Sequence, residues 1–427
     1  MMRILRADQF DPSSFKTTPI QAGNEIEQRV DDIIAAVRSR GDAALTEYAR
    51  KFDRAELSSL VVTDEEIEAA FAACPASLVR TIEKARDNIE AFHKNQKRTS
   101  FTVSEKAGVM LGQRIIPLKR VGIYVPGGTA SYPSTVLMNA IPPHIAGVKE
   151  IIMTTPPSAD GSIAPAILCA AKIAGVTKII KAGGAQAVAA LAYGTESVPA
   201  VDKIVGPGNV YVATAKRRVY GTVDIDMIAG PSEILVISDG NSNPAHIAAD
   251  LLSQAEHDKM ASAILVTDSE PLALAVQQQV ELQLARLPRN EIARVSIEDN
   301  GKIILVKDMK EAVAIANGIA PEHLELCVDE PFALMGMVES AGSVFLGRNA
   351  PEALGDYWAG PNHTLPTSGT ARFSSPLSVD DFVKKSQFIY YSREALEQAK
   401  DDIVSFAKVE GLDAHANSVA IRFGEEL

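Results

Sequence analysis

The sequence predicts an α/β protein with two doubly wound parallel sheets and helical extensions at both ends. Short runs of β-branched and apolar residues alternate with Ala-rich stretches of helical character. The first runs begin roughly 30 residues apart, which is the length of a strand followed by its crossover helix. The runs are nearly continuous in apolar residues, as expected for strands covered by helices on both faces.

Nine runs define the expected strands: VGIYV, EIIMTT, KIIKAG, DKIVGPG, SEILVIS, SAILVTD, KIILV, LELCV and SVFLG. A sheet usually holds five or six strands, so nine runs indicate two sheets. We expect the second sheet to begin at SEILVIS.

Both ends of the chain have helical character. Apolar residues between Val30 and Val37 recur with the spacing of one helix face, and a second helix is expected from Ala76 to His93. The tail from Ser392 onward is again helical, with a break at Gly411. Four segments follow: a helical arm and cap at 1–105, a first sheet domain at 106–231, a second at 232–378, and a helical tail at 379–427.

The composition excludes several classes of protein. Lys and Arg total 42 against 54 Asp and Glu, which gives a formal charge of −12 and argues against nucleic acid or an anionic membrane as partner. No apolar run approaches the roughly 20 residues of a membrane span. The start carries Asp8 and Asp11 where a secretory signal needs apolar residues. Three widely spaced cysteines exclude a disulfide framework, so we expect a cytoplasmic protein.

Residues 349–377 form a long stretch rich in Gly, Pro, Ser and Thr. A loop of this length without secondary structure of its own is usually functional or disordered. Trp358 and His363 lie inside it, which favours a functional role.

Three glycine turns each follow an expected strand and open a helix: PGGTA at 126–130, KAGGAQA at 181–187 and GPGN at 206–209. Free backbone N–H groups at such turns can hold phosphate, although each turn alone is also common for steric reasons. All three should open at the carboxyl edge of one sheet. A nucleotide site is therefore plausible there, although the G-x-G-x-x-G fingerprint is absent.

Polar clusters mark further candidate sites. Gln254 and His257 share one face of a helix and could bind one metal ion, although a solvated helix end has the same pattern. Glu322 and His323 form a carboxylate–imidazole pair suited to general base work. Neighbours on a strand point to opposite faces, so this pair can act together only in a turn, and a purely structural role stays open.

Two more clusters lie far along the chain. Asp356 and His363 belong to the long loop, and Glu410 and His415 belong to the tail. The four clusters could converge in the fold, but their spacing alone does not decide this.

The sequence also resembles the histidinol dehydrogenase family over nearly its whole length. The motifs that carry the resemblance stand in the family's order: VGIYVPGGTASYPSTVLM, GGAQAVAALAYGTESVP, DKIVGPGN, DIDMIAGPSEILVI, LLSQAEHD, APEHLEL, GDYWAGPNHTLPTSGTARF and EGLDAHANSVAIR. The resemblance implies two incomplete Rossmann-like domains of the aldehyde dehydrogenase-like kind. It also implies oxidation of L-histidinol through L-histidinal to L-histidine with two NAD, the last two steps of histidine biosynthesis.

The resemblance further implies roles for individual residues. One Zn²⁺ per subunit would be held by Gln254, His257, Asp356 and His415, and would orient the substrate. His323 would be the general base, and Glu322 would activate water for the second oxidation. Eight residues would contact the substrate: Ser232, Gln254, His257, His323, Asp356, His363, Glu410 and His415. Tyr124, Gln186 and Asn209 would lie at the NAD.

The family resemblance also implies a homodimer with intertwined subunits. In such a dimer the tail, with Glu410 and His415, would act at the partner's site. The acidic surface would attract the small cationic substrate.

Three alternatives have different sequence requirements. An aldehyde dehydrogenase-like enzyme needs an exposed, activated thiol, but Cys327 lies in an apolar strand and Cys169 in an Ala-rich helix, both typical of buried structural cysteines. A non-catalytic zinc-binding homologue would have lost a ligand or one of Glu322 and His323. A zinc hydrolase would leave the nucleotide-type turns unexplained.

Overall fold

The computed structural model describes residues 1–12, 23–127 and 132–425. The chain divides into two compact units, which we describe separately. The first combines Met1–Gln96 with Leu118–Phe382, and the second combines Lys97–Pro117 with Val383–Leu427. Each unit therefore joins segments that are distant in sequence.

The first sheet of the first unit has five parallel strands in the order β6-β5-β4-β7-β8. Its strands are β4 (Arg120–Tyr124), β5 (Glu150–Thr155), β6 (Lys178–Lys181), β7 (Lys203–Val205) and β8 (Asp224–Ile225). The order reverses between β4 and β7, which is the switch point where doubly wound sheets bind ligands.

Helices cover both faces of this sheet because successive strand residues point to opposite sides. Val121 and Ile123 pack with α3 to α6, whereas Tyr124 packs with α1, α2, α7 and α8. The helices are α1 (Asn24–Arg40), α2 (Asp42–Tyr48), α3 (Asp64–Ala73), α4 (Ala76–His93), α5 (Pro133–Ala146), α6 (Pro165–Ala174), α7 (Gly184–Tyr193) and α8 (Val210–Val219). A π-helical turn, η3 (Ala49–Asp53), continues α2.

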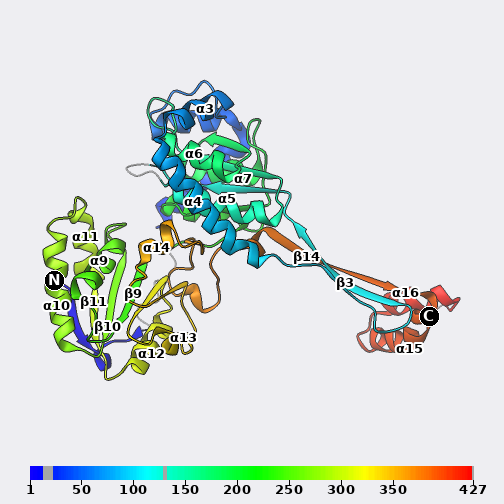
Figure 1. Ribbon diagram of the computed structural model, residues 1–427. Coiled ribbons are helices and arrows are strands. Elements are labelled where there is room, and N and C mark those ends of the chain that lie inside the picture. The colour runs from blue at the N-terminus through cyan, green and yellow to red at the C-terminus, as the bar shows by residue number, and fades with distance from the viewer. Residues whose placement is uncertain (13–22, 128–131, 426–427) are drawn as a thin grey trace. The chain divides into compact units, whose positions relative to one another are not determined.

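The second sheet has six parallel strands in the order β1-β11-β10-β9-β12-β13 (Figure 1). Its strands are β9 (Glu233–Ser238), β10 (Ser262–Thr267), β11 (Lys302–Leu305), β12 (His323–Cys327), β13 (Ser343–Leu346) and, at the edge, β1 (Arg3–Arg6). The switch point lies between β9 and β12, where His323 pairs in register with Ile234.

This sheet is also buried on both faces. Ile234 and Val236 pack under α9 to α11, while Leu235 and Ile237 pack under α12 on the other side. The helices are α9 (Pro244–Ala255), α10 (Glu270–Leu284), α11 (Asn290–Asp299), α12 (Met309–Ile319) and α13 (Pro331–Met335). Short elements complete the unit: η1 (Ala7–Gln9), η4 (Lys94–Gln96), α14 (Glu352–Tyr357), η5 (Thr370–Arg372) and η6 (Val379–Phe382).

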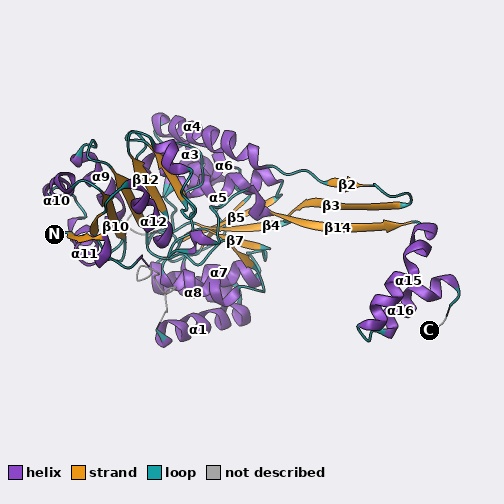
Figure 2. Ribbon diagram, turned by 90° about the horizontal axis from the view of Figure 1, so that it is seen from below, coloured by secondary structure: helices purple, strands orange, loops and turns teal. Residues whose placement is uncertain are grey.

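The second unit is an antiparallel ribbon followed by two helices (Figure 2). β3 (Val109–Pro117) pairs with β14 (Val383–Tyr391) over its whole length, and β2 (Phe101–Val103) pairs with the other edge of β3. The chain then forms α15 (Arg393–Val409), α16 (Asp413–Ala420) and η7 (Ile421–Phe423). Gly411, with φ +72°, makes the break between the two helices.

The structure confirms the α/β class with two doubly wound parallel sheets, and all nine expected strands form. The prediction that residues 349–377 have no secondary structure was wrong, because α14 and η5 form there. The N-terminal region is not wholly helical, because β1 gains hydrogen bonds as an edge strand of the second sheet. The limits of the four predicted segments stay a prediction. Within the described residues, no helix is both long and apolar enough to cross a membrane.

Candidate functional site

The predicted cofactor residues gather at the carboxyl edge of the first sheet. Tyr124 ends β4, Gln186 lies in the first turn of α7, and Asn209 caps α8 after β7. The Tyr124 hydroxyl accepts a hydrogen bond from the Gly184 N–H at 3.1 Å. Burial raises the pKa of Tyr124 to about 12, so its hydroxyl stays protonated at neutral pH.

These three residues line one cavity of about 1090 Å³, which also receives Tyr48, Phe52 and Asp53 from α2 and η3. Pro126 and Gly127 of the first glycine turn reach it, whereas the rest of PGGTA lies outside the described residues. The carboxyl edge and the size of this cavity suit an extended nucleotide.

Glu322 and His323 lie at the switch point of the second sheet, but at the amino end of its strands. Glu322 directly precedes β12, and His323 is its first residue. Both side chains are buried, and His323 Nδ1 lies 3.5 Å from Glu322 Oε2. The turn before β12 therefore lets both side chains reach one place, which an extended strand would forbid.

The surroundings fix the His323 ring. Its Nδ1 lies 3.0 Å from the backbone carbonyl oxygen of Glu233. A carbonyl can only accept, so Nδ1 carries the proton and Nε2 carries the lone pair. Burial lowers the pKa of His323 to about 4, although nearby Asp356 opposes the shift. The ring is therefore neutral at pH 7 and able to take up a proton at Nε2.

Glu233 and Glu352 are site residues that the sequence interpretation missed. Glu233 begins β9, and its backbone N–H donates to Glu322 Oε2 at 2.9 Å. Glu352 begins α14, and its Oε1 lies 3.8 Å from His323 Nε2. A glutamate directly before an apolar run is the only sequence signal for Glu233, and it is equally typical of a solvated strand end.

Asp356 brings the 349–377 segment into the site. His363 Nδ1 lies 3.5 Å from its Oδ1. Burial alone would raise the pKa of Asp356, but His363 lowers it below the usual range. Burial raises the pKa of Glu352 to about 8, with a further contribution from Asp356. His323, Glu352 and Asp356 each offer one ligand atom, and these atoms lie within 4.8 Å of one another.

Gln254 and His257 approach the same place from the end of α9. Gln254 is 1% exposed, and neither its Oε1 nor its Nε2 has a partner with hydrogen-bond geometry in the part of the chain that the structure describes. The amide still lies close enough to Glu352 to lower the pKa of that carboxyl. His257 Nδ1 lies 3.4 Å from the Ser232 hydroxyl, and His257 also affects the pKa of His323.

The donor set fits a metal ion. A buried amide without a partner costs free energy unless something binds it, and Gln254 has such an amide beside the Glu352 carboxyl. Three of the four predicted zinc ligands, namely Gln254, His257 and Asp356, belong to the first unit. Nearby, His323, Asp356 and His363 line a cavity of about 270 Å³.

The other predicted ligand belongs to the second unit. His415 lies in the first turn of α16, and Glu410 directly follows α15. Both side chains are exposed within this unit.

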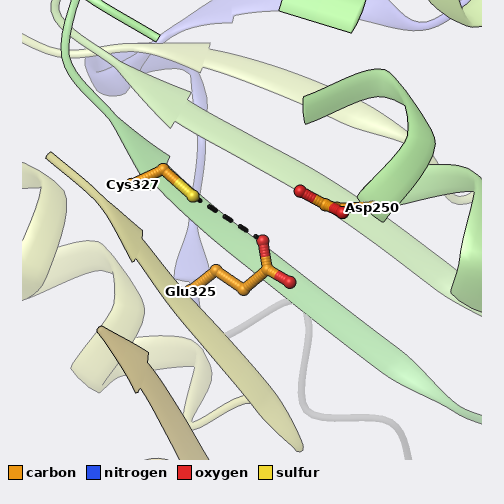
Figure 3. Close-up of side chains that lie close together, drawn as sticks. All are labelled: Asp250, Glu325 and Cys327. Carbon is orange, nitrogen blue, oxygen red and sulfur yellow. Dashed lines mark hydrogen bonds between the residues drawn. The ribbon is translucent and has the colours of Figure 1, made fainter. Parts of the chain in front are cut away.

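The cysteines lack the features of a catalytic nucleophile. Cys327 and Cys169 are buried, and burial raises the pKa of both thiols, that of Cys169 to about 11. Figure 3 shows Cys327 donating to Glu325 on β12, with Asp250 of α9 beside them. Burial also raises the pKa of Glu325. Burial thus raises the pKa values of both carboxyl groups and of the thiol in this cluster, so the sequence-based exclusion of a thiol mechanism agrees with the structure.

Comparisons with known proteins identify the family. A family model described as histidinol dehydrogenase matches residues 16–423. The histidinol dehydrogenase of Syntrophotalea carbinolica is 56% identical over 428 residues, covering 99% of both chains. That of Geobacillus kaustophilus is 57% identical over 404 residues, covering 94% of this chain and 95% of the relative.

A solved structure is similar to this chain over nearly its whole length. The crystal structure of histidinol dehydrogenase from Elizabethkingia anophelis matches with a TM-score of 0.94 and 40% identity, covering 99% of this chain and 98% of that one. The chain therefore belongs to the histidinol dehydrogenase family and is an oxidoreductase.

Proposed function

We propose that this enzyme oxidises L-histidinol to L-histidine through L-histidinal, with two NAD, at the site formed around His323 and Glu322. Family membership supports the overall reaction. The single observation that carries the residue assignment is the contact between the two side chains, with His323 Nδ1 3.5 Å from Glu322 Oε2. One site thus offers a neutral base and a carboxyl group, which the two oxidations need in turn.

His323 is the general base of the first oxidation. Its Nε2 lone pair accepts the proton of the substrate hydroxyl as hydride leaves the carbon that bears this hydroxyl. The Glu233 carbonyl holds the ring in the required tautomer. Burial keeps the ring neutral, so the base is ready at physiological pH.

Glu322 activates water for the second oxidation. The Glu233 N–H holds one carboxyl oxygen of Glu322, which leaves the other to take a proton from water as it adds to the aldehyde carbon. Burial raises the pKa of Glu322 well above its ordinary value. A high pKa makes this carboxylate a stronger base once it is ionised.

Gln254, His257, Asp356 and His415 are the residues that would hold Zn²⁺. When bound, the ion would orient the substrate through its nitrogen atoms. The buried, unpartnered amide of Gln254 supports this assignment from within the chain.

Tyr124, Gln186 and Asn209 would bind NAD in the cavity of about 1090 Å³. NAD would accept the hydride in each oxidation. Gln186 is buried, and the Tyr124 hydroxyl is held by Gly184, so both present fixed polar groups to the cavity.

A homodimer is the proposed functional form, with cytoplasmic location. Large apolar side chains are exposed on the second unit, and the most exposed are Ile389, Phe406 and Val409. Several large exposed apolar side chains on so small a unit are typical of an interface. The partner subunit would cover it, and Glu410 and His415 would then serve the partner's site.

The test is NADH formation by purified protein with L-histidinol and NAD, before chelation, after chelation and after zinc is restored. We expect activity that chelation removes and zinc restores, with one zinc per subunit by elemental analysis. A folded, zinc-replete protein that forms no NADH would refute the proposal.

A further inference from the structure

Among the described residues, the carboxylate of Glu233 accepts hydrogen bonds from backbone groups alone. Its Oε1 accepts the Ser368 N–H at 2.8 Å, and its Oε2 accepts the Glu322 N–H at 3.3 Å. The side chain is 6% exposed. Because each oxygen binds a backbone N–H and the residue has almost no exposed surface, the carboxylate is not presented to a substrate.

The backbone of Glu233 holds the two proposed catalytic side chains. Its N–H donates to Glu322 Oε2 at 2.9 Å, and its carbonyl oxygen accepts from His323 Nδ1 at 3.0 Å. Glu233 and Glu322 therefore each bind the other's backbone N–H. This reciprocal pair joins the starts of β9 and β12. It lies just before the first residue pair of their ladder, His323 with Ile234.

A third segment closes the arrangement. Ser368 has φ +57°, a left-handed conformation that costs energy for a residue other than glycine. Its neighbour Thr367 accepts the Gly230 N–H through Oγ1 at 2.6 Å. Ser232 therefore lies between two anchors, Gly230 and Glu233, that both bind residues 367–368.

We propose that Glu233 is the positioning residue of this site, fixing Glu322, His323 and Ser232 relative to one another without touching the substrate. This inference rests on the proposed function, because those three residues are assigned by it. Misplacing a reacting group by about 1 Å can reduce turnover about 100-fold. Loss of Glu233 should therefore reduce turnover strongly, although Glu233 acts only through the residues that it positions.

The charge of Glu233 should affect the pH dependence of L-histidinal oxidation, which a purely structural role would leave unchanged. The titratable groups that face Glu322 are Glu233, Asp356, Glu352 and His323. Burial raises the pKa of Glu233 itself to about 7, so its carboxyl is charged above that pH. Burial likewise raises the pKa of Glu322, and the charge of Glu233 raises it further, whereas the Glu233 backbone N–H lowers it. Neutralising Glu233 should therefore shift the acid limb of L-histidinal oxidation to lower pH.

The experiment compares Glu233→Gln with wild type in L-histidinol and L-histidinal oxidation across pH. We expect kcat to fall about 10-fold to 100-fold with little change in KM, and the acid limb to shift to lower pH. The matched control is Asp202→Asn, because Asp202 Oδ2 also accepts two backbone N–H groups, of Lys119 at 3.0 Å and Arg120 at 3.1 Å, at the amino end of β4. The control should keep wild-type kcat and pH profile.

A second variant keeps the test valid if Glu233→Gln fails to fold. Thr367→Val removes only the acceptor of the Gly230 N–H, and should raise the KM for L-histidinol several-fold by loosening Ser232. Wild-type kinetics in a folded Glu233→Gln, or in Thr367→Val where the former is insoluble, would overturn this inference. Absence of wild-type activity on L-histidinol would instead refute the proposed function.

Discussion

His323 and Glu322 are adjacent in sequence and buried in the same place, yet their pKa values shift in opposite directions. Burial disfavours the charged form of both groups, so it lowers the pKa of the imidazole and raises that of the carboxyl. One physical cause thus gives two different groups, a neutral base and a carboxyl with a high pKa. Pairs whose pKa values are pushed apart are typical of acid–base sites.

Replacing His323 tests the base directly. His323→Asn should lower kcat for L-histidinol about 10²-fold to 10⁴-fold, the usual contribution of a general base. The KM should change little if the ring acts mainly on the departing proton. Steady-state kinetics measure both. His144→Asn, at an exposed position of α5, is the matched control, and equal losses in both variants would contradict the assignment.

Asp53 gives a prediction about pH and stability. Burial raises its pKa to about 6, and its Oδ2 has no hydrogen-bond partner among the residues described. Because the folded state favours the protonated acid, Asp53 weakens the fold as pH rises from about 4 to about 6. Asp53→Asn should therefore have a higher melting temperature than wild type above pH 6, without NAD, and an equal one below pH 4. The same difference in melting temperature between Asp53→Asn and wild type at every pH would contradict this explanation.

The turn after β7 shows how an element shapes the cofactor cavity. Gly206 has φ +115°, and a Cβ there would lie 2.1 Å from the Tyr124 carbonyl oxygen. The Gly206 N–H donates to Asp226 Oδ2 at 2.7 Å, which fixes the turn that leads to Asn209. Only glycine fits this close approach of two backbones.

Gly206→Ala should therefore displace the turn. Strain of at least about 1 to 2 kcal/mol corresponds to about a tenfold rise in the KM for NAD. Gly221→Ala is the matched control, since Gly221 has φ +98° but open space around its Cβ position. Its KM for NAD should stay unchanged while stability falls slightly. Equal KM values in both variants would contradict the role of the turn.

Nine strands of the two parallel sheets could be predicted because they are largely buried and leave continuous apolar runs. The edge strands β1 and β8 could not, because their residues are exposed or half-buried. The β3–β14 ribbon could not be predicted this way. Most of its side chains are exposed or half-buried, so no burial pattern marks it, and Val383 pairs with Pro117 from a distant part of the chain. The position of the glycine turns at the carboxyl edge could be predicted from the alternation of strands and helices alone.

The candidate site divides in the same way. Glu322, His323 and Asp356 occupy motifs that resemble a known family, so their importance could be predicted. Glu233 and Glu352 could not, because a glutamate at the start of a strand or helix is ordinary in sequence. Their roles depend on Ser368, Glu322 and Asp356 being brought beside them by the fold.

At the scale of the whole molecule, we propose that two chains complete each site. His323 belongs to the first unit and His415 to the second. If tails act at the partner's site, a heterodimer of His323→Ala and His415→Ala chains contains one intact site and one doubly defective site. Each verified heterodimer should then recover about half the wild-type activity. Each parent alone should be inactive, and inactive heterodimers would contradict tails acting in trans.

The count of NADH formed per L-histidinol consumed tests the account most directly, because it asks whether one site completes both oxidations. Wild type should form about two NADH per substrate. Folded Glu322→Gln should form about one and release L-histidinal, since His323 remains for the first oxidation. One NADH from wild type, or two from Glu322→Gln, would contradict the division of work between His323 and Glu322.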